Sequence, residues 1–123
     1  MDKKMLVTKE FVFHAAHYLT GDRLRENLHG HSYRVQVTVE GEVDEDGVVM
    51  DFRDLKKIAK AEAVDKLDHS NLNDLLEQPT AENVVSWIWE KLEGTLPAGL
   101  NLREIKLWET ATSFVTYRGP ERR

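Results

Sequence analysis

The sequence predicts an α+β protein: a four-stranded antiparallel sheet with two helices inserted between the second and third strands. Two β-rich stretches come first, at Met5–His17 and Tyr33–Val39. Two helical stripes of apolar residues occupy the middle of the chain, and two more β-rich stretches follow, at Asn101–Thr110 and Ser113–Arg118. Helices inserted into one connection of an antiparallel sheet cover one of its faces.

The two N-terminal strands are predicted from composition and alternation. Met5–His17 is rich in β-branched and aromatic residues, and its odd-numbered residues share a face. Tyr33–Val39 alternates apolar and polar residues without exception, which is typical of a half-buried antiparallel strand. The polar segment Tyr18–Asn27 between them is predicted to be a loop long enough to carry function, and the acidic segment Glu42–Gly47 a solvated turn.

Two helices are predicted in the middle of the chain. Asp51 stands at the N-cap of the first, whose apolar stripe ends near Asp68. A loop over residues 70–78 follows, and then Thr80 caps a second helix that ends at Gly94. The residues expected on the buried faces are Phe52, Leu55, Ile58, Ala59, Ala63 and Leu67, then Ala81, Val84, Val85, Ile88 and Leu92.

Composition limits the class of protein. The 123 residues are expected to form a single domain, 1–123, and the net charge of −5 provides no basic footprint for nucleic acid. The absence of cysteine excludes disulfides, thiolate metal sites and a cysteine nucleophile. The N-terminus lacks the apolar region of a signal peptide and no apolar run reaches membrane-spanning length, so a cytoplasmic protein without membrane contact is expected.

The predicted sheet has one face that the helices leave uncovered and two open edges. Proteins avoid this state by pairing or closing their sheets, and the uncovered face still carries apolar side chains. We therefore expect a homo-oligomer. Trp87 and Trp89 fall outside the apolar stripe of the second helix, so they are expected to meet another subunit or the edge of the sheet.

Three histidines form a candidate metal site. His29 and His31 project from one face of an extended segment, because they are separated by a single residue. His17 lies at the end of the preceding strand, where antiparallel pairing would bring it beside them. Three imidazoles with one open position are typical of a catalytic zinc site. The alternative is that the His29–His31 pair merely opens the second strand, while His14 is a rival ligand of opposite parity.

Two further groups are candidates for proton chemistry and binding. A carboxylate beside an imidazole, as at Asp68-His69, makes a proton shuttle, but a histidine at a helix C-terminus is also favourable without any catalytic role. Glu109 lies on a strand rich in apolar residues, where a carboxylate needs a partner. The alternative for Glu109 is an exposed position on an edge strand.

Five motifs occur in order: Phe13–His17, Leu28–Tyr33, Leu67–Asn73, Pro79–Asn83 and Trp108–Thr110. With them the chain resembles, over nearly its whole length, the 6-pyruvoyltetrahydropterin synthase/6-carboxytetrahydropterin synthase family. The resemblance implies the tunnelling fold (T-fold). It also implies that trimers close into a barrel, that two trimers stack into a homohexamer, and that the active sites lie at subunit boundaries.

The resemblance further implies a zinc-dependent lyase acting on a small dihydropterin, typically 7,8-dihydroneopterin triphosphate. Zinc would be held by His17, His29 and His31. The relay histidine would be His69, paired with Asp68, and Glu109 would anchor the pterin. Thr80 and Glu82 match residues near the family's pterin pocket, although helix capping explains them equally well.

One feature departs from the family pattern. The usual synthases carry a catalytic cysteine shortly before the histidine pair, whereas the only nearby group here that can accept a proton at neutral pH is Glu26. Family relatives with glutamate in this region cleave the side chain by a retro-aldol route. Apolar walls would raise the pKa of Glu26, while cationic arginines and zinc would lower it. Arg23 and Arg25 could instead bind the triphosphate.

Three functions follow, in this order. The first is a zinc lyase that makes 6-carboxy-5,6,7,8-tetrahydropterin for queuosine or archaeosine synthesis, or the related 6-pyruvoyl product. The second is a glutamate-type aldolase that releases 6-hydroxymethyl-7,8-dihydropterin for folate synthesis. The third is a catalytically silent paralogue that binds zinc and pterin. Retention of Asp68, His69 and Glu109 disfavours the third, because binding alone would not need the relay.

Overall fold

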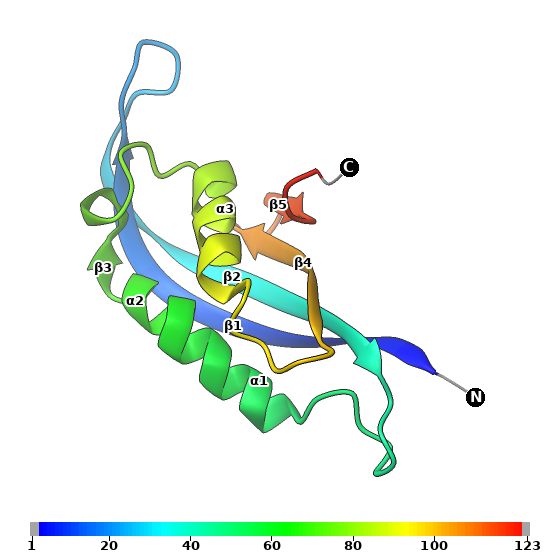
Figure 1. The fold of residues 1–123 in the computed structure, drawn as a ribbon. Coiled ribbons are helices and arrows are strands. Elements are labelled where there is room, and N and C mark those ends of the chain that lie inside the picture. The colour runs from blue at the N-terminus through cyan, green and yellow to red at the C-terminus, as the bar shows by residue number, and fades with distance from the viewer. Residues whose placement is uncertain (1–2, 122–123) are drawn as a thin grey trace.

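A computed structural model describes residues 3–121 and shows one curved sheet with helices on one of its faces (Figure 1). The strand order is β3-β1-β2-β4-β5, and all neighbouring strands are antiparallel except β3, which runs parallel to β1. The strands are β1 (Lys4–Leu19), β2 (Glu26–Glu42), β3 (Ser70–Asn71), β4 (Asn101–Trp108) and β5 (Phe114–Tyr117).

The helical residues form two segments. The first is continuous and contains α1 (Phe52–Ala59), a π-helical turn (Lys60–Val64) and α2 (Asp65–Leu67). A 3-10 turn (Leu72–Asp74) follows, and the second segment is the helix α3 (Ala81–Leu92). Both predicted caps are present, because Asp51 accepts from the backbone N–H of Arg53 and Thr80 from that of Asn83. Within residues 3–121, no helix has the length and apolarity needed to cross a membrane.

The core lies between the helices and the sheet face formed by odd-numbered residues of β1, β2 and β4. Phe13 and Tyr33 stack on this face with ring centroids 4.9 Å apart, and both are fully buried. Most of the predicted helix stripes point into this core. The buried helix residues are Leu55, Ala59, Ala63, Val64, Leu67, Val84, Val85, Ile88, Trp89 and Leu92.

The strands differ from the prediction in length and number. The hairpin of β1 and β2 stays paired from Lys4 opposite Glu42 to Leu19 opposite Glu26, so the predicted loop 18–27 shrinks and the His29–His31 pair lies inside a strand. A fifth strand, β3, lies in the segment predicted as loop. The strand β3 has only two residues, which is too short for any hydrophobic periodicity to be detected in the sequence. Its pairing with Ala15 and Ala16 of β1 is what makes it a strand.

The structure corrects one burial prediction and completes that for the tryptophans. Phe52, predicted on the buried stripe, is half exposed because it lies at the start of α1, beyond the layer that covers the core. Trp89 is buried and packs edge-on against Tyr117 of β5, with ring centroids 5.5 Å apart. The sheet edge is therefore the contact of Trp89, while Trp87 packs partly buried against the core.

Candidate metal centre

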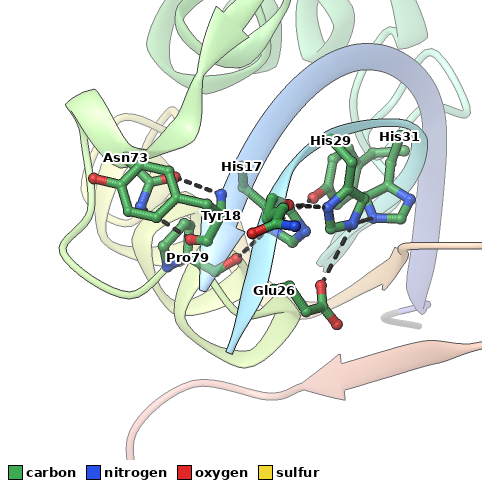
Figure 2. Close-up of polar contacts among 9 residues, drawn as sticks. His17, Tyr18, Glu26, His29, His31, Asn73 and Pro79 are labelled. Carbon is green, nitrogen blue, oxygen red and sulfur yellow. Dashed lines mark hydrogen bonds and ion pairs between the residues drawn. The ribbon is translucent and has the colours of Figure 1, made fainter. Parts of the chain in front are cut away.

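The three histidines predicted as ligands lie together at one end of the long hairpin. His17 of β1 pairs with His29 of β2, and His31 lies two residues further along β2 on the same face. The candidate ligand atoms of the three side chains all lie within 4.8 Å of one another. Figure 2 shows the rings of His29 and His31 beside each other, with His17 on the adjoining strand.

Backbone carbonyls set the tautomers of two rings. The Nδ1 atom of His17 donates to the Pro79 carbonyl at 2.8 Å, and that of His29 donates to the Asn27 carbonyl at 2.6 Å (Figure 2). A carbonyl only accepts, so each ring carries its proton on Nδ1 and presents an Nε2 lone pair. This arrangement is the usual outer-shell support of a metal-binding histidine.

The Nε2 atom of His17 provides the test of whether a metal fits. It is buried and has no hydrogen-bond partner within the described residues. Such an atom costs about 1–3 kcal/mol unless something satisfies it. The Nε2 atoms of His29 and His31 face each other at 2.9 Å, as two nitrogens directed at a common centre do. A divalent ion between the three rings would satisfy all three nitrogens, so these residues fit a metal.

The surroundings keep His31 in the form that binds metal. Its pKa is lowered first by desolvation, and the nearby His17 and His29 lower it further because a positive charge on His31 would be repelled by one on either ring. Glu109 and Glu26 oppose this shift. Tyr33 lies beneath the centre with its hydroxyl 3.4 Å from the Nδ1 atom of His17. Burial raises the pKa of Tyr33, so its hydroxyl stays protonated.

Glu26 stands at the exposed side of the centre. Its Oε2 atom lies 3.4 Å from the Nε2 atom of His29 (Figure 2), and about half of its side chain is exposed to solvent. The bulge in the β1–β2 ladder between His17 and Leu19 leaves Glu26 paired with Leu19 at the end of the hairpin. The structure therefore brings the predicted base next to the predicted metal ligands.

A pocket of about 520 Å³ contains three other predicted site residues. Glu109, Thr80 and Glu82 line it together with Arg23. Glu109 lies just beyond β4, in the turn to β5, rather than on the strand as predicted, and its N–H donates to the Ser113 carbonyl at 3.1 Å. The charge of Glu109 raises the pKa of His31, so Glu109 lies within electrostatic range of that ring, although no histidine lines the pocket.

Asp68 and His69 lie next to His14 of β1. The backbone N–H of His14 donates to Asp68 Oδ1 at 2.9 Å, and the Nδ1 atom of His69 lies 3.2 Å from Asp68 Oδ2. His14 is exposed on the face opposite His17, as its parity predicts. A second pocket, of about 530 Å³, is lined by His14, Ser32 and His69 together with Gly30 and His31.

The two carbonyls that orient the rings and the tyrosine beneath the centre were not identified from the sequence. The carbonyls of Pro79 and Asn27 orient the rings, but every residue has a carbonyl, and only the fold selects these two. Tyr33 belongs to the predicted strand, and its odd number could have placed it beneath the centre, because it shares the face of His29 and His31.

The fold and the site together define a tunnelling-fold protein with a cluster of three histidines that could hold a metal ion and a separate pocket lined by carboxylates. A sequence model described as 6-pyruvoyl tetrahydropterin synthase matches residues 6–120. The chain belongs to the 6-pyruvoyl tetrahydropterin synthase family.

Individual relatives differ in their named activities. The dihydroneopterin monophosphate aldolase of Pyrococcus furiosus is 43% identical over 97 residues, which cover 79% of this chain and 82% of the relative. The 6-carboxy-5,6,7,8-tetrahydropterin synthase of Haemophilus influenzae is 34% identical over 139 residues, which cover 91% of this chain and 97% of the relative. The structure of Caenorhabditis elegans 6-pyruvoyl tetrahydropterin synthase superposes on this chain with a TM-score of 0.82 at 30% sequence identity. The match covers 96% of this chain and 97% of the Caenorhabditis chain.

Proposed function

We propose that this chain is a zinc-dependent aldolase that cleaves the side chain of a phosphorylated 7,8-dihydroneopterin and releases 6-hydroxymethyl-7,8-dihydropterin. The observation that carries the proposal is the position of Glu26 beside the three histidines, in a chain without cysteine. The sequence alone puts the synthase reaction first. The placement of Glu26 and the similarity to the Pyrococcus aldolase favour the aldolase instead.

Glu26 is proposed as the general base. Its carboxylate accepts the proton of the substrate's 2′-hydroxyl, the C1′–C2′ bond breaks, and C2′ leaves as an aldehyde that carries the phosphate. The electron pair of the broken bond forms a C1′=C6 double bond while the C6=N5 π pair moves onto N5 of the dihydropterin. Protonation at C1′ then restores the C6=N5 bond and gives the hydroxymethyl product. The half-exposed position of Glu26 gives it access to solvent, through which its proton can be lost again.

Zinc is proposed as the metal because three neutral imidazoles with an open position are its usual catalytic ligand set. When bound, zinc supplies a Lewis acid that polarises the oxygens of the side chain. The protein's part is to orient the rings. The Pro79 and Asn27 carbonyls hold His17 and His29 in the required tautomer, and burial keeps His31 neutral.

The pocket around Glu109 is proposed to hold the pterin. A carboxylate has two oxygens that match the parallel donors of the pterin 2-amino group and ring N–H. Arg23 is the one cation among the described residues that line this pocket, while Glu82 and Glu109 are both acidic. This charge balance supports a substrate with a single phosphate rather than a triphosphate. Thr80 lines the pocket and also caps α3.

Asp68 and His69 are proposed to act at the centre of a neighbouring subunit in a homohexamer. Within one chain they lie with His14, on the opposite face of β1 from His17. The open edge of β5, and the side of β1 beyond its two-residue pairing with the edge strand β3, support assembly through strand pairing. In such an assembly, His69 supplies the proton that C1′ receives.

The second candidate is the synthase reaction with 6-carboxy-5,6,7,8-tetrahydropterin as its product. The similarity to the Haemophilus synthase over 91% of this chain favours it. The absence of any cysteine removes the base that the usual synthases employ.

Product analysis separates the candidates. The zinc-loaded protein is incubated with dihydroneopterin monophosphate and, separately, with the triphosphate, and the products are identified by mass spectrometry. Hydroxymethyl-dihydropterin with phosphorylated glycolaldehyde supports the aldolase. Acetaldehyde with a carboxypterin supports the synthase, and unchanged substrate in both reactions refutes both. E26Q should lower kcat about 100-fold or more at unchanged zinc content, whereas the matched surface variant E45Q should not.

A further inference from the structure

A second pair of histidines lies on the sheet face that the helices leave uncovered. His14 projects from β1, and His69 lies between α2 and β3, with ring centroids 6.1 Å apart. Both are exposed and line the pocket of about 530 Å³ described above. Neither ring belongs to the three-histidine cluster.

The inner nitrogen of each ring already has a partner. The Nδ1 atom of His14 lies 2.9 Å from the hydroxyl of Ser32, and that of His69 lies 3.2 Å from Asp68 Oδ2. The carboxylate of Asp68 also accepts from the backbone N–H of His14 at 2.9 Å, which fixes it beside both rings. An ionised carboxylate only accepts, and a hydroxyl can accept, so both rings can keep their proton on Nδ1 and leave Nε2 free.

We propose that the Nε2 atoms of His14 and His69 bind a second divalent transition-metal ion. A carboxylate or hydroxyl on one ring nitrogen and a metal on the other is the usual arrangement of metal-binding histidines. The ring separation is only slightly larger than the 4.6–5.1 Å between rings of the three-histidine centre. Because His69 is 78% exposed, its ring can turn towards His14 without disturbing the core.

The backbone holds His69 at this position. Among the described residues, His69 is the only non-glycine residue with a positive φ, at 58°. Its N–H donates to the carbonyl of His14 at 2.6 Å, and the next residue, Ser70, pairs with Ala15. A left-handed conformation that the surroundings enforce is typical of functional positions. Here it places one imidazole beside the other.

The two sites should differ in affinity and in effect. Two imidazoles bind more weakly than three, because water must complete the coordination. This effect rests on the proposed function, in which His69 donates a proton: a metal bound to His69 would occupy the ring nitrogen needed for that proton transfer. Zinc in excess of the first equivalent should therefore inhibit turnover.

Calorimetric titration of metal-free protein with Zn²⁺ tests the second site directly. We expect two classes of site in the wild type, each with one ion per chain. H14Q and H69N should lose the weaker class, with affinity lowered at least tenfold, and retain the tighter one. H29A should lose the tighter class of site and retain the weaker one. Asparagine is chosen at position 69 because it tolerates the left-handed conformation.

A single class in the wild type would overturn the proposal, as would a weaker class that survives in both H14Q and H69N. Circular dichroism establishes that each variant is folded, and for H14Q and H69N retention of the tighter class establishes it independently. The titration needs no turnover, so it decides this proposal even if the aldolase assignment fails. If turnover is present, inhibition by excess zinc should disappear in H14Q, and inhibition that persists unchanged there would contradict the link to His69.

Discussion

Removing the metal should destabilise the protein, because an ion would satisfy the buried Nε2 atom of His17, and the size of the effect follows from ligand-binding linkage. Free zinc at 100 times its dissociation constant stabilises a single-site protein by about 2.7 kcal/mol. At about 2.1 cal/mol/K per residue, the unfolding entropy of 123 residues is about 0.26 kcal/mol/K, so the melting temperature should fall by about 10 °C on metal removal.

Scanning fluorimetry of the chelated protein, with and without added Zn²⁺, measures this shift. His29 is the informative ligand to replace, because it is half exposed and its loss leaves the core intact. H29A should lose most of the shift, and H14Q, measured at the same low zinc concentration, should retain it. Equal melting temperatures with and without zinc, or a full shift in H29A, would refute the ligand assignment.

Three further predictions concern stability. G119A should cost about 2 kcal/mol or more in urea unfolding, because its Cβ would overlap the Trp89 indole and its φ is +88°; a neutral result would contradict this contact. T80A should cost about 1 kcal/mol and T80S should be nearly neutral, because the Thr80 hydroxyl accepts from the Asn83 N–H at 3.2 Å; equal losses would exclude capping. The backbone N–H of His14 holds the pKa of Asp68 below its ordinary value, so the contribution of Asp68 to stability is present above the ordinary pKa and is lost as the pH falls through the folded pKa. D68N should remove this acid-side loss in urea midpoints measured from about pH 5 to pH 2.5, and an unchanged pH profile would contradict it.

Hydrophobic periodicity predicted those parts of the fold in which the pattern of apolar residues along the sequence matches the pattern of buried side chains in the structure. Alternation over Tyr33–Val39 identified β2, and the parity of His14 and His17 placed their rings on opposite faces of β1. Thr80 was recognisable as a helix cap because an oxygen-bearing side chain stands directly before an apolar helical stripe.

The remaining features depend on contacts between distant residues. β3 exists only through its pairing with β1, and the extension of β2 through His29 depends on its partner strand rather than on its own composition. The ring of His69 lies beside that of His14 because a backbone hydrogen bond between the two segments fixes a left-handed residue. No local pattern encodes such a contact, since it is set by the register of packed elements.

The hydrogen bond from His17 to the Pro79 carbonyl ties the ion site to the start of α3. Thr80, the next residue, caps that helix, and its carbonyl accepts from the Val84 N–H at 2.9 Å. An ion that immobilises the His17 ring therefore also anchors the first turn of α3. When the ion leaves, that turn should open more often, and its amide protons should exchange with deuterium earlier than those near Leu92.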